Sequence, residues 1–568
     1  MKTYDLVIKN GTIIDGKRTP RFTGDIGIVD GLIDEIGRID ESNAKKVIDA
    51  TGLIVAPGTV DLHTHFDSQL FWDPWCTMGG WHGITSVVIG NCGFGFAPVK
   101  PEDQDMAMKT MERNEAVRFE TMKEGMPWDW ETHPEYLDSV ERTPKGVNVL
   151  TYTPLGPIMS YVMGRDNAKS RACTPEEQKE ICRLIGESID AGSCGISAQK
   201  LGVNSVQRDV DGTPMITDTM SEEDFLAFAG VLKEKGKGLI QVLGGEREQN
   251  EKLMDASGRP LLWNAVALVT DAHGLTFGSV WELTDWLEKC NAEGKRIIGH
   301  AVTAASDYQF TLEDFNLFDS EPDWRVLTMG TIEERIEKMK DPALRAPLIE
   351  NYKFKHSFLG AIASNIHELK FAECQNQELN VKYAGLFIHE IAEQENKHPI
   401  DVFLDLSIAD NLQVIWVTPP QRIEMESMKR LANHPFTVPG LSDGGAHMKF
   451  LTMGRYPTEF IAHLVRDNNI MSLEKAHWKL AAYPAQIAGF KDRGSLQEGL
   501  AADIIIYDLD ELDVLPMERI YDFPAGDWRL AQKSTGYKWT IVNGEVTFVD
   551  GECTNATPGV LLRNGAAA

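Results

Sequence analysis

The segment GLIVAPGTVDLHTHFDSQ, residues 52–69, has the pattern of a buried strand that ends in polar residues. Its first part is rich in Val, Ile and Leu and is bounded by Gly and Pro, which is typical of a strand covered on both faces. Alternate residues of a strand point to the same face, so His63 and His65 can contact one ion. The alternative is that one imidazole packs in a core while the other faces solvent.

The composition indicates a packed globular protein that does not bind nucleic acid. Of the 568 residues, 42% are hydrophobic and 25% are charged, which provides enough apolar material for a large core. The 56 basic and 85 acidic residues give a net charge of −29, which repels phosphate backbones and anionic membranes. The acidic residues are spread along the chain, so we attribute this charge to solubility.

The sequence shows no signal for secretion or membrane insertion. The N-terminal segment MKTYDLVIKNGTIIDG lacks the basic and apolar stretches of a secretion signal, and no apolar run approaches about 18 residues. The eight cysteines are scattered without CxxC pairs, which is typical of reduced thiols in an intracellular protein. We therefore expect a cytoplasmic enzyme without disulfide bonds and without a membrane partner.

Both ends of the chain have the pattern of β-hairpins. Residues 1–56 alternate apolar and polar positions, and residues 498–556 repeat this texture. Four dipeptides in these segments favour type I′ turns: Asn10-Gly11, Asp30-Gly31, Asn543-Gly544 and Asp550-Gly551. We therefore expect the two segments to form one small β-sandwich domain.

The middle of the chain, residues 57–497, alternates short apolar strands with amphipathic helices. After the first strand, the strand-like segments are GITSVVIGN, GVNVLTYTP, CGISAQK, GLIQVLG, RIIGHAV, LQVIWVTP and FTVPGLSDGGAH. The segment TPEEQKEICRLIGESIDAG begins with Thr174 and Pro175 and ends in glycine, as a helix should. About eight repeats predict an α/β fold, a TIM-like (β/α)8 barrel. Residues from about 310 to 400 are helix-rich and fit a helical insertion.

Candidate metal ligands follow five of the predicted strands. They are His63 with His65, Cys92, Lys200, His300 and Asp443. In a parallel barrel the carboxyl ends of the strands meet at one mouth, although the residues are far apart in the chain. Imidazoles, a thiolate and a carboxylate together form a zinc-type ligand set. The sequence therefore predicts a metal centre at this mouth.

Several longer motifs resemble the amidohydrolase superfamily, and within it the N-acyl-D-amino-acid deacylase (D-aminoacylase) family. They are PGTVDLHTHFD, GNCGFGFAPVKPED, LSDGGAH, YPTEFI and DRGSLQEGLAADIIIYD followed by VNGEVTFVDGE, and they extend almost from end to end. GNCGFGFAP is the segment more specific to the deacylases. The resemblance implies a metal-dependent barrel, a flanking β-sandwich from both termini and hydrolysis of an amide bond in a small molecule.

The resemblance also assigns roles to single residues. It implies that His63 and His65 are metal ligands, that Cys92 is a thiolate ligand and that His300 is a ligand from the sixth strand. Asp443 matches the aspartate of the eighth strand, which serves as general base and lies among the metal ligands. The alternative for Cys92 is a small buried thiol beside glycines.

Two features depart from the family. The fifth strand, where family members have a histidine, has Val242 nearest the expected place, with Gln241 or Glu246 as substitutes. The arginine that would hold a substrate carboxylate has no clear counterpart, and Lys449 and Arg455 are nearby candidates for substrate binding. These departures leave both the substrate and the number of metal ions open.

Lys200 follows the fourth strand, where many amidohydrolases carry a carbamylated lysine. That group bridges two metal ions, and its formation needs a neutral amine, which burial can supply by lowering the lysine pKa. The alternative is an unmodified lysine that binds a substrate carboxylate or faces solvent. We therefore expect one or two divalent ions, with Zn²⁺ as the first choice. His447, in a Gly-rich turn, can hydrogen-bond the substrate's developing oxyanion or the base.

These residues favour a hydrolase in which metal-activated water attacks an amide carbonyl and Asp443 acts as general base. The first hypothesis for the substrate is an N-acyl amino acid. The second is a cyclic amide or imide, opened as in hydantoinases and dihydropyrimidinases. The third is a non-catalytic oligomeric scaffold, although the presence of His63, His65, His300 and Asp443 together argues against it. Barrels of this kind often associate through their helices, so we also expect a homo-oligomer.

Overall fold

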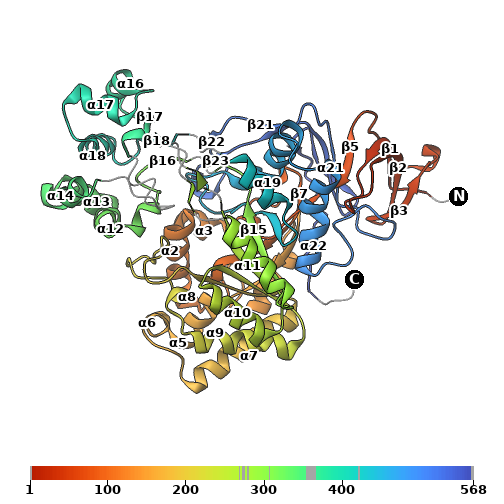
Figure 1. The fold of residues 1–568 in the computed structure, drawn as a ribbon, viewed down its shortest axis with the longest axis horizontal. Helices are drawn as coiled ribbons and strands as arrows, with labels where there is room; N and C mark the ends of the chain where they lie inside the picture. The colour runs from red at the N-terminus through yellow and green to blue at the C-terminus, as the bar shows by residue number, and fades with distance from the viewer. Residues whose placement is uncertain are drawn as a thin grey trace.

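The computed structural model describes residues 3–267, 269–270, 276–277, 280–305, 308–352, 366–419 and 423–564. A sheet built from the N-terminal strands lies at one side of a larger α/β region, and a helix-rich segment lies at the opposite side (Figure 1). Among the described helices, none combines the length and the apolar character that crossing a membrane requires.

Nine strands from the two ends of the chain form one sheet, in the order β27-β26-β25-β20-β5-β1-β2-β3, with β4 beside β1. The N-terminal strands are β1 Leu6–Ile13, β2 Phe22–Val29, β3 Leu32–Gly37, β4 Val47–Asp49 and β5 Ile54–Pro57. The C-terminal strands are β20 Ile504–Tyr507, β25 Tyr537–Val542, β26 Glu545–Val549 and β27 Glu552–Cys553. Since β5 pairs antiparallel with β20, the two ends of the chain are joined in one sheet.

Three of the four predicted turns connect strands of this sheet. Residues 30–31, 543–544 and 550–551 have left-handed φ at both positions, as a type I′ turn requires. The prediction of a turn at Asn10-Gly11 is wrong, because both residues lie inside β1, at an irregularity of its pairing with β2. A Cβ on Gly11 would overlap the side chain of Val55, so glycine allows β1 to approach β5 closely.

The middle of the chain contains two parallel sheets, of three and six strands. The first consists of β6 Thr59–Asp61, β7 Ile84–Ile89 and β8 Asn148–Thr151. The second consists of β9 Thr153–Pro154, β10 Gly195–Lys200, β11 Leu239–Gly244, β12 Leu261–Val266, β15 Ile297–Val302 and β19 Thr437–Gly440. Only Tyr152 separates β8 from β9, and Thr64 bridges Gly444 in parallel. The two sheets therefore adjoin at both edges.

The parallel strands are buried on both faces. One hydrophobic cluster takes side chains from or next to these strands: Val60, Leu62, Val88, Leu150, Tyr152, Cys194, Leu239, Leu262, Ile298 and Val438. On the opposite face, side chains such as Ile196, Val242 and Ala301 pack in a second cluster with residues of the covering helices. Burial on both faces explains why the sequences of these strands are apolar almost throughout.

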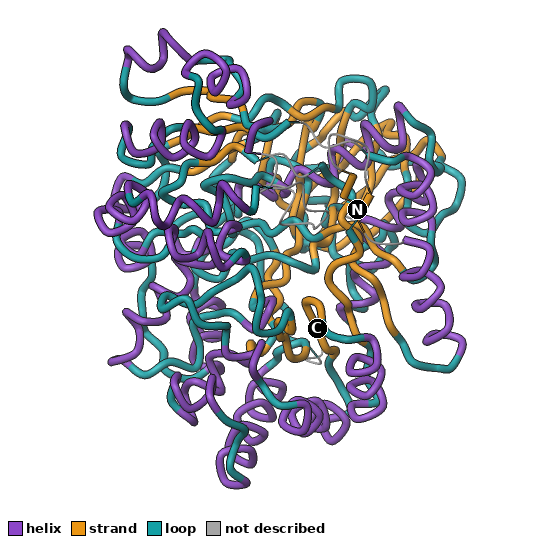
Figure 2. Tube along the Cα trace, turned by 60° about the vertical axis from the view of Figure 1, so that its left-hand side comes forward, coloured by secondary structure: helices purple, strands orange, loops and turns teal. Residues whose placement is uncertain are grey.

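Helices lie on several sides of the strands (Figure 2). The helices outside the helix-rich segment include α2 Gln104–Glu115, α3 Phe119–Gly125, α4 His133–Arg142, α5 Leu155–Met163, α6 Arg165–Ser170, α7 Pro175–Ala191, α8 Ile216–Thr219, α9 Glu222–Lys235, α10 Arg247–Ser257, α11 Val280–Ala292, α19 Met425–Asn433 and α22 Tyr483–Ala488. Helix α7 begins as predicted, because Thr174 and Glu177 form a reciprocal capping box. Gly192, with φ 119, ends it.

The helix-rich segment lies between β15 and β19. It contains an antiparallel sheet with the order β16-β18-β17, formed by β16 Gln309–Phe310, β18 Ile415–Val417 and β17 Lys370–Glu373. Its helices are α12 Pro322–Thr328, α13 Ile332–Lys340, α14 Pro342–Glu350, α16 Gln377–Tyr383, α17 Ile388–Glu395 and α18 Pro399–Ala409. The prediction that LQVIWVTP forms a parallel strand is wrong, because β18 pairs antiparallel with both neighbours.

A strand that the sequence analysis did not recognise changes the numbering of the parallel strands. Strand β12, in the segment PLLWNAV, pairs in parallel with β11 and with β15. When β8 and β9 are counted as one strand, β12 is the sixth parallel strand and β15 the seventh. His300 on β15 therefore lies on the seventh strand, and the residue of β12 beside it is Asn264.

Candidate active site

His63 and His65 lie together in the loop that follows β6. Both imidazoles are buried, and their ring centroids are 5.3 Å apart. Thr64 between them points away, since its hydroxyl donates to the carbonyl of Val88 at 2.8 Å. The backbone N–H of His65 donates to the carbonyl of Gly444 at 2.7 Å, which fixes this loop against the chain after β19. The two imidazoles therefore face one site, and neither is exposed to solvent.

Cys92 completes a compact group of three donor side chains. Its Sγ lies 3.4 Å from Nε2 of His63, and the ligand atoms of His63, His65 and Cys92 all lie within 4.8 Å of one another. Cys92 has φ 58 in the turn after β7, and its backbone N–H donates to Oε1 of Gln241 at 2.8 Å. This hydrogen bond holds the turn that directs the thiol towards the two imidazoles.

The chemistry of these donors fits a divalent cation of the zinc type. Burial lowers the pKa of His65 to about 3, so the ring is neutral, which is the form that binds metal ions. Its Nδ1 is buried and has no hydrogen-bond partner in the described part of the chain. Burial raises the pKa of the Cys92 thiol well above its usual range, and a cation beside it would stabilise the thiolate.

Asp443 lies beside this group, after β19. One of its carboxylate oxygens is 3.2 Å from Nε2 of His63 and 4.0 Å from Nε2 of His65. Burial acts to raise the pKa of Asp443, but the hydrogen bond and charge of His63 and the charges of His447 and His65 outweigh it, and the pKa is lowered to about 2. The carboxylate is therefore ionised at neutral pH and can accept a proton.

The backbone around Asp443 adopts an unfavourable conformation. Leu441, Asp443 and His447 have φ values of 62, 48 and 56, in a region that costs residues other than glycine free energy. The hydroxyl of Ser442 donates to the carbonyl of His63 at 3.2 Å and so ties this segment to the loop after β6. Backbone strain of this kind is typical of functional sites.

His300 lies near the donor group but offers it no free nitrogen. Its ring centroid is 6.0 Å from that of His63. The backbone N–H of Leu441 donates to Nε2 of His300 at 3.1 Å, and Nδ1 lies 2.9 Å from Oδ1 of Asn264. Both ring nitrogens of His300 are therefore in hydrogen bonds with the protein, as are those of His63, so either ring would have to release one of these bonds to bind a metal ion.

Lys200 points away from the donor group. Lys200 lies on the same face of β10 as Ile196 and Ala198, because alternate residues of a strand point the same way. The side chains of Ile196 and Ala198 pack in the cluster on the helix side. Its Nζ donates to the carbonyl of Met220 at 2.8 Å and to that of Asp218 at 3.3 Å. Burial lowers the pKa of Lys200, as carbamylation would require, but the side chain is on the wrong face of the strand to bridge two metal ions.

Gln241 is the polar side chain that strand β11 presents at the site. Val242, the position nearest the family histidine, packs on the helix side, and Glu246 is exposed in the loop before α10. Gln241 is buried and accepts the hydrogen bond from Cys92, while its own Nε2 has no partner among the described residues. Of the substitutes weighed from the sequence, Gln241 is therefore the one in contact with a donor residue.

The three residues expected to bind substrate have different surroundings. Nε2 of His447 lies 3.5 Å from a carboxylate oxygen of Glu115, and burial lowers the pKa of His447. Lys449 donates to Asp527 at 2.5 Å and to the carbonyl of Trp528. Arg455 donates to the carbonyl groups of Thr452 at 3.0 Å and Ala305 at 2.5 Å, and Glu459 is 3.2 Å from its Nε. Both cations are thus engaged by the protein, and only His447 stays close to the site.

Two residues of the site escaped the sequence analysis. Glu115 is buried at the end of α2, 3.9 Å from Nδ1 of His65, and both of its oxygens have no hydrogen-bond partner in the described ranges. Burial and the charges of Asp443 and Asp67 raise its pKa well above the usual range. The sequence pattern that could have identified Glu115 is an acidic residue at helical spacing from the apolar residues of α2. Asn264 was missed because its strand was not recognised.

Over most of its length the chain is similar to known proteins. A model of the amidohydrolase family matches residues 46–548. An uncharacterized protein of Mycobacterium tuberculosis is 25% identical over 548 residues, 90% of this chain and 85% of that protein. The D-aminoacylase of Alcaligenes xylosoxydans xylosoxydans is 26% identical over 513 residues, 89% of this chain and 88% of that enzyme.

A solved structure shares the fold of this chain. It is the N-acyl-D-glutamate deacylase from Bordetella bronchiseptica, complexed with zinc and a phosphonate inhibitor. The TM-score is 0.67 at 20% identity, and the alignment covers 99% of this chain and 100% of that one. The arrangement of the strands and helices is therefore common to both proteins.

Proposed function

Since this chain belongs to the amidohydrolase family, we propose that it hydrolyses the amide bond of an N-acyl amino acid, using a divalent metal ion held by His63, His65 and Cys92. The chain is a hydrolase of C–N bonds other than peptide bonds. The observation that carries the proposal is the grouping of the three ligand atoms within 4.8 Å of one another, beside the carboxylate of Asp443.

The proposed metal content is a single zinc ion. Two imidazoles and a thiolate are donors that zinc prefers. When bound, such an ion lowers the pKa of water to about 7 and polarises a carbonyl group. A second ion has less support, because Lys200, the residue expected to bridge two ions, faces the helices and hydrogen-bonds Met220.

Asp443 is the general base in this proposal. Its carboxylate is ionised and lies 3.2 Å from Nε2 of His63, at the edge of the donor group. From this position it can accept a proton from the attacking water and return it to the departing amine. His447 has a buried Nδ1 without a partner among the described residues, and we assign it to hydrogen bonding with the substrate.

The substrate class follows from the similarity to D-aminoacylase combined with the geometry of the site. A cyclic amide or imide has less support, because the hydantoinase-like mechanism relies on a carbamylated lysine and Lys200 does not face the donor group. A non-catalytic scaffold has no need for an ionised carboxylate beside buried donors on a strained backbone.

At the level of the fold, we propose that the parallel sheets close into one (β/α)8 barrel. The bridge between Thr64 and Gly444 and the shared hydrophobic cluster support closure. The proposed domains are a barrel at 57–497 with an insertion at about 310–400, and a β-sandwich from 1–56 and 498–556. The pairing of β5 with β20 supports one domain built from both terminal segments, whose strands share a nine-stranded sheet. Cytoplasmic location and homo-oligomeric assembly stay predictions.

Metal analysis and a substrate panel test the function together. Protein purified without chelators is expected to carry one zinc ion per chain, and its hydrolysis of N-acyl-D- or N-acyl-L-amino acids should stop on chelation and return with zinc. Absence of bound metal, with no gain on adding zinc, would favour the scaffold. Turnover of hydantoins and dihydropyrimidines without turnover of any N-acyl amino acid would favour ring opening.

A further inference from the structure

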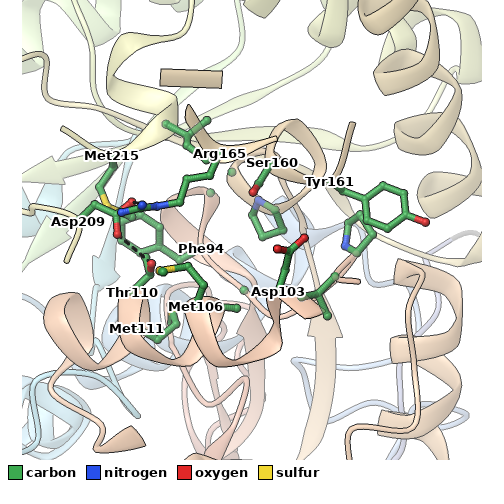
Figure 3. A pocket seen from close by; sticks show the side chains of 18 of the residues that line it. Phe94, Asp103, Met106, Thr110, Met111, Ser160, Tyr161, Arg165, Asp209 and Met215 are labelled. Atoms are coloured by element: carbon green, nitrogen blue, oxygen red, sulfur yellow. Dashed lines mark hydrogen bonds and ion pairs between the residues drawn. The ribbon is translucent and has the colours of Figure 1, made fainter. Parts of the chain in front are cut away.

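A cavity of about 370 Å³ begins at the turn that carries Cys92 (Figure 3). Gly93 and Phe94, which follow Cys92 and are buried, line its inner end. The ring of Phe94 lies 6.3 Å from that of His65 between centroids. Helices α2, α5 and α8 supply much of the remaining wall. This volume is typical of small-molecule sites, and the wall includes the two residues that follow Cys92.

The wall of this cavity is mainly apolar. Its larger apolar side chains are Phe94, Val99, Met106, Met111, Met215 and Ile216. Figure 3 shows the three methionines among the side chains around the cavity. Methionine side chains are unbranched and polarizable, so they adapt to flexible apolar ligands. Met106 is 37% exposed, which places the outer end of the cavity at the surface.

The charged groups beside the cavity are paired with one another. Asp209 is buried and accepts a hydrogen bond from Arg165 at 2.9 Å, and Nζ of Lys169 lies 2.6 Å from it. Thr110 also donates to Asp209, at 2.9 Å (Figure 3). Arg165 is in addition 3.2 Å from Asp211. Nε of the guanidinium thus donates to one carboxylate and Nη2 lies beside a second, although Nη2 is buried and makes no hydrogen bond within the described residues.

The mouth of the cavity carries more negative than positive charge. Lys100 lies there together with Glu102 and Asp103, both of which are exposed. An anionic group entering the cavity would meet these carboxylates and be repelled by them. The cavity therefore suits an uncharged group.

Thr217 gives the inner end one polar group. Its hydroxyl is buried and has no hydrogen-bond partner within the described residues, although it lines the cavity. Its methyl group lies 3.1 Å from the position that a Cβ on Gly93 would take, so the residue is adjacent to the turn after Cys92. The hydroxyl can donate a hydrogen bond to a carbonyl oxygen of the ligand.

We infer that this cavity binds the acyl chain of the substrate and that the chain is an extended, apolar one. The inference rests on the proposed function. In an N-acyl amino acid the carboxylate lies on the amine side of the scissile bond. Binding of the amino acid side chain in the cavity would therefore also place the carboxylate near the cavity. The acyl half carries no charge, which matches a cavity whose wall is mainly apolar, whose mouth carries more carboxylates than cations and which reaches the surface at Met106.

The test compares acyl chains of different length on one amino acid. Ala107 on α2 lines the cavity, and Ala107→Phe places a ring inside it. Lys109 is exposed, two residues further along the same helix, and does not line the cavity, so Lys109→Phe is the matched control. A second variant, Met106→Asp, changes only the exposed mouth and avoids any effect of overpacking on folding.

For the wild type we expect kcat/KM on N-octanoyl substrates to exceed that on N-acetyl substrates roughly tenfold or more, because each buried methylene adds to binding. Ala107→Phe and Met106→Asp should each remove most of this difference between the two acyl lengths. Lys109→Phe should behave as wild type. Equal turnover of both acyl lengths by the wild type, or a preference that survives in both cavity variants, would overturn the inference and leave the proposed function standing.

Binding of octanamide, a neutral probe, separates the inference from the proposed function. Titration calorimetry should detect octanamide binding to the wild type and to Lys109→Phe, and binding should weaken at least tenfold in Ala107→Phe. If octanamide binds in this way while no N-acyl amino acid is hydrolysed, the proposed function fails and an apolar cavity site is supported. If octanamide binds all three proteins equally, or none, the cavity does not take an apolar chain.

Discussion

The side-chain amide of Asn264 donates a hydrogen bond to Nδ1 of His63 at 2.9 Å. The direction of this bond follows from its neighbours. Because Leu441 donates to Nε2 of His300, the proton of the neutral His300 ring is on Nδ1 and faces Oδ1 of Asn264. The NH₂ group of Asn264 is left for His63. His63 therefore carries its proton on Nε2, where it is donated to Asp443 at 3.2 Å.

The first prediction is that Asn264→Asp tightens zinc binding. A carboxylate at this position accepts hydrogen bonds from the Nδ1–H groups of both His63 and His300, so Nε2 of His63 is free to bind the ion. Changes in such hydrogen-bond partners typically alter metal affinity by about 10- to 100-fold, and we expect a gain at the lower end of that range. Competition with a chelating dye measures the affinity. Asn433→Asp, on a distant helix, is the control, and an affinity that is unchanged or weaker in Asn264→Asp would contradict the proton arrangement.

Lys200→Met should leave zinc content and kcat/KM within about twofold of the wild type, since the side chain hydrogen-bonds carbonyl groups on the helix side and does not reach the donor group. Elemental analysis and steady-state kinetics on the same preparation measure both quantities. A loss of metal together with a large loss of activity would show instead that Lys200 is a carbamylated bridging ligand.

Asp443→Asn should lower kcat by about 10²- to 10⁴-fold while metal content is largely retained, because an amide cannot accept the proton of the attacking water. His63, His65 and Cys92 remain as ligands in this variant. Asp467→Asn, an exposed carboxylate outside the site, is the control. Substantial residual turnover in purified Asp443→Asn would show that another group is the base.

Three buried histidines outside the site predict a loss of stability in mild acid. Burial lowers the pKa of His82 to about 4, of His133 to about 4 and of His477 to about 3. The unfolded chain binds a proton near pH 6.5, whereas the folded protein keeps these rings neutral until much lower pH. The contribution of these neutral histidines to the free energy of unfolding is therefore present above pH 6.5 and is lost as the pH falls towards 4.

At pH 5.5 each of these histidines should cost about 1 kcal/mol of unfolding free energy relative to pH 7.5. Asp61 and Asp67, whose pKa burial raises to about 7, act in the opposite direction over this range, so the measurement compares a variant with the wild type. In urea unfolding, His82→Gln should lose about 1 kcal/mol less than the wild type between these pH values. Identical losses would contradict a depressed pKa for His82.

The sequence predicts the strand ends that matter most for the site. His63, His65, Cys92 and Asp443 are far apart in the chain, and parallel strands bring them together because their carboxyl ends lie on one side. This inference needed only the positions of short apolar runs and the polar residues after them. The terminal strands were equally readable, because their alternation and most of their turns are local signals.

Membership in a sheet is not a local property, and for this reason one predicted strand was wrong and another was missed, although the number of parallel strands remains eight. LQVIWVTP and PLLWNAV are both short apolar runs, yet β18 joins an antiparallel sheet and β12 joins the parallel one. When both faces of a strand are buried, the sequence pattern also does not show towards which face a given side chain points. Lys200 and Gln241 therefore required the structure, which puts Lys200 towards the helices and Gln241 beside Cys92.

The pairing of β5 with β20 has a consequence for synthesis of the chain. Pro57 is the partner of Ile504, so the N-terminal strands must wait for almost the entire polypeptide to leave the ribosome before their sheet is complete. Contacts between such distant positions form late and slowly, and the exposed edge of β5 is meanwhile open to wrong partners. Truncation from the C-terminus before residue 504 should therefore yield an insoluble product even when the parallel strands are all present.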